Sequence, residues 1–446
     1  MIDEQQVEEL RAQMARVVIR DDPAWMAEEA RPLLASIDET LQQAGDLAFP
    51  LPSDLVVALQ RVLSTAMDRL ENGVEEARRN PRVANIFAAF ALRTYLLALV
   101  SRVGLPAGFW RTLTGLCLSL LHEGNAAIRG ELAWLLALAA ADPRFMDARE
   151  LLWALRWVQS NDPVIVLHRP GEAEEDGFVM SLQLDEPPEP KAWFFKRADS
   201  PEPSLSFSLE ELAKRAEEEI RQLDGIDWTM RRRVEGGVTA DGRVALLREL
   251  LDRWRYGWQQ RLPRKPFDAM AELLVGWEDV LRQRMGLPTH IRPVRVTDVS
   301  ISGYELRWTD REQALFFPGQ VVAIRAGGDL RWILALVRWL RQHPHGLQMG
   351  IQAVGFEPEV VALSHGKPAP PGFPAQMALA VRKTPPLRVQ PALICPTGTI
   401  AGSRLAMASE PAVGQWLLSQ VRFIRFEAQT RCVEVLQYEV DPFPED

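Results

Sequence analysis

Residues 294–308 read VRVTDVSISGYELRW, and this stretch decides the fold of the second half of the chain. Apolar and polar residues alternate along 294–300 and again along 304–308, which is typical of strands with one buried and one solvated face. Gly303 separates the two runs and predicts a turn between them. The stretch is therefore expected to form two neighbouring strands of an antiparallel sheet.

Further short strands are predicted on both sides of this pair. Their sequences are FDAMAELLV (267–275), VVAIRA (321–326), WILALVRWL (332–340) and LQMGIQAVG (347–355). WEDVLRQRM (277–285) reads as a helix inserted after the first of them. Short strands separated by Gly- and Pro-containing turns predict a compact antiparallel barrel or sandwich.

The segment Asp298-Val299-Ser300-Ile301-Ser302-Gly303 matches the pattern [DN]xSxxG at every fixed position. Together with PGQVVAIR, the LALVRWL strand containing Trp339 and the closing GLQMGIQ, it makes residues 261–360 resemble a PilZ domain, a bacterial β-barrel receptor for cyclic di-GMP. The resemblance covers under a quarter of the chain. It implies a PilZ-like antiparallel β-barrel that binds cyclic di-GMP, with Asp298, Ser300 and Gly303 at the ligand.

The chemistry of these three residues suits such a ligand. An ionised Asp298 can accept hydrogen bonds from the N1–H and N2–H edge of guanine. Ser300, two residues along the same strand, lies on the same face and can reach base or phosphate. Gly303 permits a turn with positive φ and leaves room for the ligand. Asp298 and Ser300 can also simply stabilise a strand-end turn through side-chain to backbone hydrogen bonds, and the sequence leaves both interpretations open.

The family's second motif, RxxxR ahead of the first strand, is altered here. The nearest basic cluster is Arg261-Leu262-Pro263-Arg264-Lys265, with two residues rather than three between the arginines unless Lys265 replaces the second. Lysine is a point charge without the planar fork of arginine, so the change would weaken bidentate recognition. We predict ligand contacts from Arg261, Arg264, Lys265 and Arg295. Other possible cations are Arg282, Arg284 and Arg292.

The whole chain is predicted to be a multidomain α + β protein. Its expected parts are an N-terminal all-α helical domain (1–160), a connecting segment with a hairpin and a charged helix (161–250), the PilZ-like barrel (251–365) and a second small β module (366–446). The hairpin would be formed by 164–168 and 178–184, and the charged helix by 209–223. The last 81 residues could alternatively complete the first barrel.

Composition and motif content argue against several classes of protein. A formal net charge of −9 argues against a nucleic-acid coat, and no apolar run reaches the ~20 residues that span a bilayer, so no membrane insertion is expected. Three widely spaced cysteines predict neither a disulfide framework nor a metal site and indicate a cytoplasmic protein. Motifs for a nucleophile elbow, a phosphate-binding loop or a zinc protease do not occur in the sequence, which predicts a protein that is not an enzyme and needs no cofactor.

Two hypotheses for function follow. In the first, the barrel senses cyclic di-GMP and the helical domain engages a protein partner that the sequence does not identify. In the second, the barrel is degenerate and the chain is a scaffold or adaptor that binds proteins without nucleotide.

Overall fold

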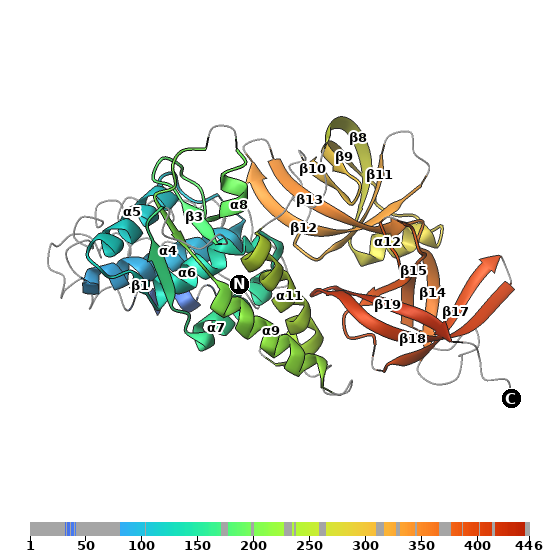
Figure 1. The fold of residues 1–446 in the computed structure, drawn as a ribbon. Coiled ribbons are helices and arrows are strands. Elements are labelled where there is room, and N and C mark those ends of the chain that lie inside the picture. The colour runs from blue at the N-terminus through green and yellow to red at the C-terminus, as the bar shows by residue number, and fades with distance from the viewer. Residues whose placement is uncertain are drawn as a thin grey trace. The chain divides into compact units, whose positions relative to one another are not determined.

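The computed structural model describes residues 81–441, except 103, 171–176, 198–199, 227–233, 236–237, 258–264, 309–315, 327–330, 344–345, 365–375, 386, 401 and 413–414, together with part of 32–41 (Figure 1). The chain divides into two compact units. One contains 1–144, 148–220 and 247–259, and the other contains 145–147, 221–246 and 260–446. The predicted α + β class, with helices in the N-terminal half and β-barrels in the C-terminal half, is confirmed.

Helices dominate the first unit because their apolar residues recur at helical spacing. In α6 (Glu131–Ala140) the sequence ELAWLLALAA is buried on nearly every side, as its continuous apolar surface predicts. The predicted charged helix is α9 (Glu210–Asp224), which buries a narrow stripe containing Leu212 and Ala216. The other helical elements that precede the barrels in the chain are α4 (Pro81–Ser101), α5 (Phe109–His122), a 3-10 turn (Pro143–Phe145), α7 (Ala148–Asn161), α8 (Lys191–Phe194) and α11 (Ala240–Tyr256).

A five-stranded antiparallel sheet in the order β1-β2-β5-β3-β4 accompanies these helices. Its strands are β1 (Ala127–Ile128), β2 (Ile165–His168), β3 (Phe178–Met180), β4 (Glu189–Pro190) and β5 (Leu205–Phe207). The sequence suggested that 164–168 and 178–184 form a hairpin, but β5 lies between these two strands and pairs with both. β5 has only three residues, so the alternation in SLSFS (204–208) is too short to identify a strand.

In the second unit, six strands close into a first barrel in the order β10-β13-β12-β11-β8-β9. They are β8 (Lys265–Val275), β9 (Arg292–Ser300), β10 (Gly303–Trp308), β11 (Val321–Ala326), β12 (Ile333–His343) and β13 (Gly346–Phe356). The inserted helix is α12 (Trp277–Arg284). Every strand predicted for this barrel, and the helix, is confirmed. A short two-stranded sheet, β6 (Val234–Glu235) and β7 (Val238–Thr239), lies earlier in the chain.

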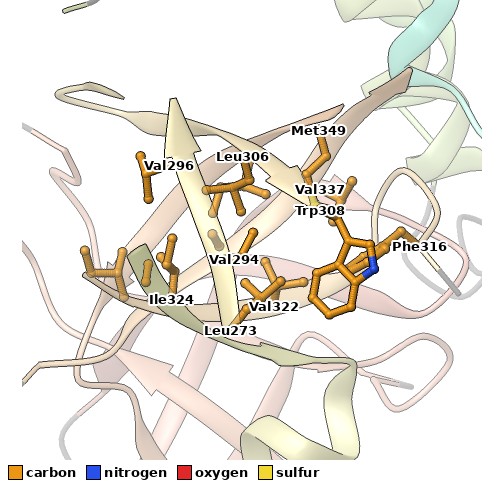
Figure 2. Close-up of a cluster of buried hydrophobic side chains, with 14 of the residues drawn as sticks. Leu273, Val294, Val296, Leu306, Trp308, Phe316, Val322, Ile324, Val337 and Met349 are labelled. Carbon is orange, nitrogen blue, oxygen red and sulfur yellow. The ribbon is translucent and has the colours of Figure 1, made fainter. Parts of the chain in front are cut away.

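Alternate residues of each strand fill the interior of the first barrel (Figure 2). Val296 and Leu306 are fully buried there, and the indole of Trp308 meets the ring of Phe316 edge to face at 5.3 Å. This filled core fixes which side of each strand faces outward, because neighbouring residues on a strand point to opposite faces.

A second closed barrel follows, in the order β14-β15-β16-β19-β18-β17. Its strands are β14 (Glu359–Ser364), β15 (Gln376–Val381), β16 (Ala392–Pro396), β17 (Arg404–Ala412), β18 (Gln415–Gln429) and β19 (Val433–Asp441). In both barrels the first strand pairs with the second and fourth, and the third pairs with the sixth, so the two share one topology. The C-terminal residues thus form a barrel of their own instead of completing the first.

The two barrels share a buried apolar interface. Leu274, Val321 and Leu334 of the first barrel pack in one cluster with Leu379 and Ile394 of the second. Arg388, in the connection between β15 and β16, donates its Nε–H to the Val354 carbonyl of the first barrel at 2.8 Å and pairs with Glu427 through both Nη atoms. The β15–β16 connection and the β9–β10 turn each join the second and third strands of their barrels. In the second barrel, this connection contacts the first barrel through Arg388.

Candidate ligand-binding site

The DxSxxG motif forms the end of β9, a two-residue turn and the start of β10. Ser300 pairs with Gly303 across the turn, and Asp298 pairs with Glu305. The Ser300 hydroxyl donates to the Gly303 carbonyl oxygen at 3.3 Å. The side chains of Asp298 and Ser300 are half-buried at the edge of the barrel, and the Oδ1 atom of Asp298 is itself buried.

A β-bulge at Thr297 turns the motif outward. Val296 pairs with Leu306 and Asp298 pairs with Glu305, so β9 has one residue more than β10 at this point. Without the bulge, Asp298 would continue the inward series of Val294 and Val296. With it, Asp298 and Ser300 share the outer face, as the sequence predicted for the pair.

A second carboxylate lies opposite Asp298 on this face. Glu305 Oε1 accepts hydrogen bonds from the Thr297 hydroxyl at 3.0 Å and from Gln348 Nε2 at 2.7 Å. These donors fix the position of Glu305 on β10. The edge therefore presents two carboxylates in register, which is a suitable acceptor set for the N–H groups of a purine base.

The prediction that Gly303 allows a turn with positive φ is wrong. Gly303 does not have a positive φ, and a Cβ atom added to it would overlap the carbonyl oxygen of Ile351 on β13. Gly303 is needed because β10 and β13 approach closely here, not because of the turn conformation. The sequence alone cannot distinguish these two reasons for a glycine.

Of the four predicted ligand cations, the structure describes Lys265 and Arg295. Arg261 and Arg264 lie outside the described residues. Lys265 is the first residue of β8, is exposed, and pairs with Val299, while Pro266 pairs with Asp298. The chain therefore enters the barrel directly beside the motif.

Arg295 lies on the outer face of β9 and forms a two-pronged ion pair with Asp268, Nε to Oδ1 and Nη2 to Oδ2, each 2.6 Å long. The hydrogen bond from Arg295 lowers the pKa of Asp268 below its usual value. Both partners are exposed, so the pair is weakly stabilising and can exchange for another anion. Of the remaining candidates, Arg282 and Arg284 are on α12, where Arg284 pairs with Glu357, and Arg292 is the first residue of β9.

Sequence reasoning did not assign four residues of this face to the site: Glu305, Arg307, Arg341 and Trp339. The alternation in YELRW does place Glu305 and Arg307 on one face, but only the cross-strand register shows that this is the face of Asp298. The indole of Trp339 lies against Gly350, the β13 residue paired with Glu305. An aromatic plane beside two carboxylates can stack on a purine.

None of the described helices is long and apolar enough to cross a membrane. Within the same described residues, His, Cys, Asp and Glu side chains form no group of three or more that could hold a metal ion.

The fold and this edge define a small closed β-barrel with a polar outer edge at the β9–β10 turn. Residues 283–357, from the end of α12 through β13, match the family model described as the middle PilZ domain of the cyclic-di-GMP receptor FimW. The first barrel therefore contains a PilZ domain, and the resemblance seen in the sequence is confirmed for this part of the chain. No curated protein matches the chain.

Proposed function

We propose that the chain is a cytoplasmic cyclic di-GMP effector. The first barrel binds the dinucleotide at the β9–β10 edge, and the helical unit engages a protein partner. The observation that carries this proposal is the outward placement of Asp298 and Ser300 beside Lys265, within a segment matched to a cyclic-di-GMP receptor domain.

Each residue has a role that its position supports. The Asp298 carboxylate accepts hydrogen bonds from guanine, and the Ser300 hydroxyl, which now donates to a carbonyl in its own turn, redirects to base or phosphate. Lys265 supplies a positive charge at the same edge. Arg261 and Arg264 precede it by four residues and one residue in the chain and are proposed to contact the ligand as well. Arg295 joins them by exchanging Asp268 for a phosphate.

Calorimetric titration of the full chain with cyclic di-GMP tests the proposal. We expect one nucleotide-binding edge per chain, because the matching connection of the second barrel, RKTPPLRVQP (382–391), lacks the DxSxxG motif and uses Arg388 to contact the first barrel. Cyclic di-AMP should bind more weakly, since adenine has no N1–H for Asp298. Absence of binding up to about 100 µM cyclic di-GMP would contradict the proposal.

A second candidate function is a scaffold that binds proteins without nucleotide. The departure of 261–265 from RxxxR and the engagement of Arg295 by Asp268 both favour it. Affinity capture of partners by the full chain, with and without cyclic di-GMP, separates the two functions. Capture that does not change with nucleotide favours the scaffold, whereas nucleotide-dependent capture favours the effector.

A further inference from the structure

Three arginines form a line across the outer face of the first barrel, next to the Asp298–Glu305 pair. Arg307 on β10 pairs with Arg295 on β9 and with Gln348 on β13, and Gln348 pairs with Arg341 on β12. We call Arg295, Arg307 and Arg341 the arginine row. Adjacent strands lie ~4.8 Å apart, so the row extends roughly 14 Å over four strands.

The core shows that the row faces outward. Leu306 and Met349, the neighbours of Arg307 and Gln348, are fully buried inside the barrel. On β12, a second bulge lies between Val337 and Trp339; it keeps Leu340 inside and turns Arg341 outward. Arg341 is exposed and Arg307 is half-buried. Ligand in solution can therefore reach this surface.

Among the described residues, Arg295 is the one arginine of the row that is hydrogen-bonded to a carboxylate, Asp268. Arginines directly opposite each other on neighbouring strands repel. Asp268 forms a two-pronged pair with Arg295 and attracts Arg307 without a hydrogen bond to it. Among the residues that the structure describes, the Nε of Arg307 is buried with no hydrogen-bond partner. A strand face that places three cations in line is suited to an anion.

Two neighbouring cross-strand rows, one of carboxylates and one of arginines, place negative and positive charges as a cyclic dinucleotide would need them. One row carries the carboxylates Asp298 and Glu305, and the arginine row lies two residues farther along β10, ~7 Å away. Carboxylates accept from the N–H groups of guanine, and arginine forks pair with phosphate oxygens. A ligand whose bases and phosphates are both fixed in one ring can contact both rows together.

We propose that Arg307 and Arg341, with Arg295, bind the phosphates of the dinucleotide and thereby set its affinity, while Asp298 sets its base specificity. This inference rests on the proposed function. It gives the barrel cations of its own, in addition to those on the altered segment ahead of β8.

The test uses the full chain with Arg307→Gln and Arg341→Gln, titrated with cyclic di-GMP and cyclic di-AMP. Arg422→Gln is the matched control, because Arg422 is an exposed strand arginine of the second barrel, where it pairs with Glu439. Each test variant should raise the Kd for cyclic di-GMP by about ten- to a hundred-fold, since it removes a charge-assisted hydrogen bond. The control should stay within about two-fold of the unmodified chain.

Two further readouts separate phosphate binding from a merely structural role. Affinity should depend less on salt in the test variants when about 50 and about 200 mM NaCl are compared, because fewer ionic contacts form. The ratio of the cyclic di-GMP and cyclic di-AMP affinities should not change, because both ligands carry the same phosphates. Melting temperatures show whether each variant is folded, and the exposed Arg341 provides a test even where Arg307→Gln is unstable.

Three results would overturn the inference. If the unmodified chain binds and both variants bind equally well, the arginine row does not contact the ligand, although the proposed function stands. A loss of affinity accompanied by a changed base preference would assign the arginines to the bases instead. If the unmodified chain fails to bind cyclic di-GMP, the proposed function and the inference fall together.

Discussion

Asp298→Ala is expected to raise the Kd for cyclic di-GMP by about a hundred-fold or more. The substitution removes the acceptor for the guanine N1–H and N2–H groups, and two charge-assisted hydrogen bonds are together worth ~3 kcal/mol. The side chain is half-buried on the outer face, beyond the bulge at Thr297, so the barrel core is unchanged. Titration calorimetry of the folded variant measures the effect.

Glu439→Ala is the matched control for Asp298→Ala. Glu439 is a carboxylate on an exposed strand face of the second barrel, paired with Arg422. Its loss should leave the Kd unchanged. The role of Asp298 is contradicted if both variants bind cyclic di-GMP as tightly as the unmodified chain.

Gly303→Ala is expected to destabilise the first barrel by about 3 kcal/mol, because the added methyl group must displace the Ile351 backbone of the neighbouring strand. A change of this size lowers the melting temperature by roughly 6–12 °C for a unit of this length. It should also weaken ligand binding, since Gly303 pairs with Ser300.

Gly104→Ala provides the comparison for this effect. Gly104 is exposed, and an added Cβ atom meets nothing within 4 Å. Scanning calorimetry should therefore show a change of at most about 0.5 kcal/mol for this variant. Equal melting temperatures for the two alanine variants would show that the close approach of β10 and β13 does not constrain Gly303.

The strands of the first barrel could be predicted because they are short apolar runs with interspersed polar residues, separated by Gly- and Pro-containing turns. β14 (Glu359–Ser364) and β15 (Gln376–Val381) were not predicted as strands of the second barrel. Each has only six residues, and they flank a proline-rich stretch. A short apolar run does not indicate which sheet it joins, so the sequence predicted a small β module without showing that it closes separately.

The candidate site was only partly predictable, because the cross-strand register of the first barrel decides which residues share its outer face. Asp298, Ser300 and Lys265 could be found from the motif and the basic cluster. Arg307 and Arg341 could not, because the bulge on β9 and the bulge on β12 decide which residues share the outer face. A one-residue bulge reverses the alternation and leaves no clear signal in the sequence.

Hydrogen–deuterium exchange of the full chain with and without cyclic di-GMP tests most directly where the nucleotide binds. We expect slower amide exchange at 298–303 and 265–268, with no change at 382–391, the matching connection of the second barrel. Protection confined to the second barrel or to the helical unit, with 298–303 exchanging as before, would contradict a binding site at the β9–β10 edge.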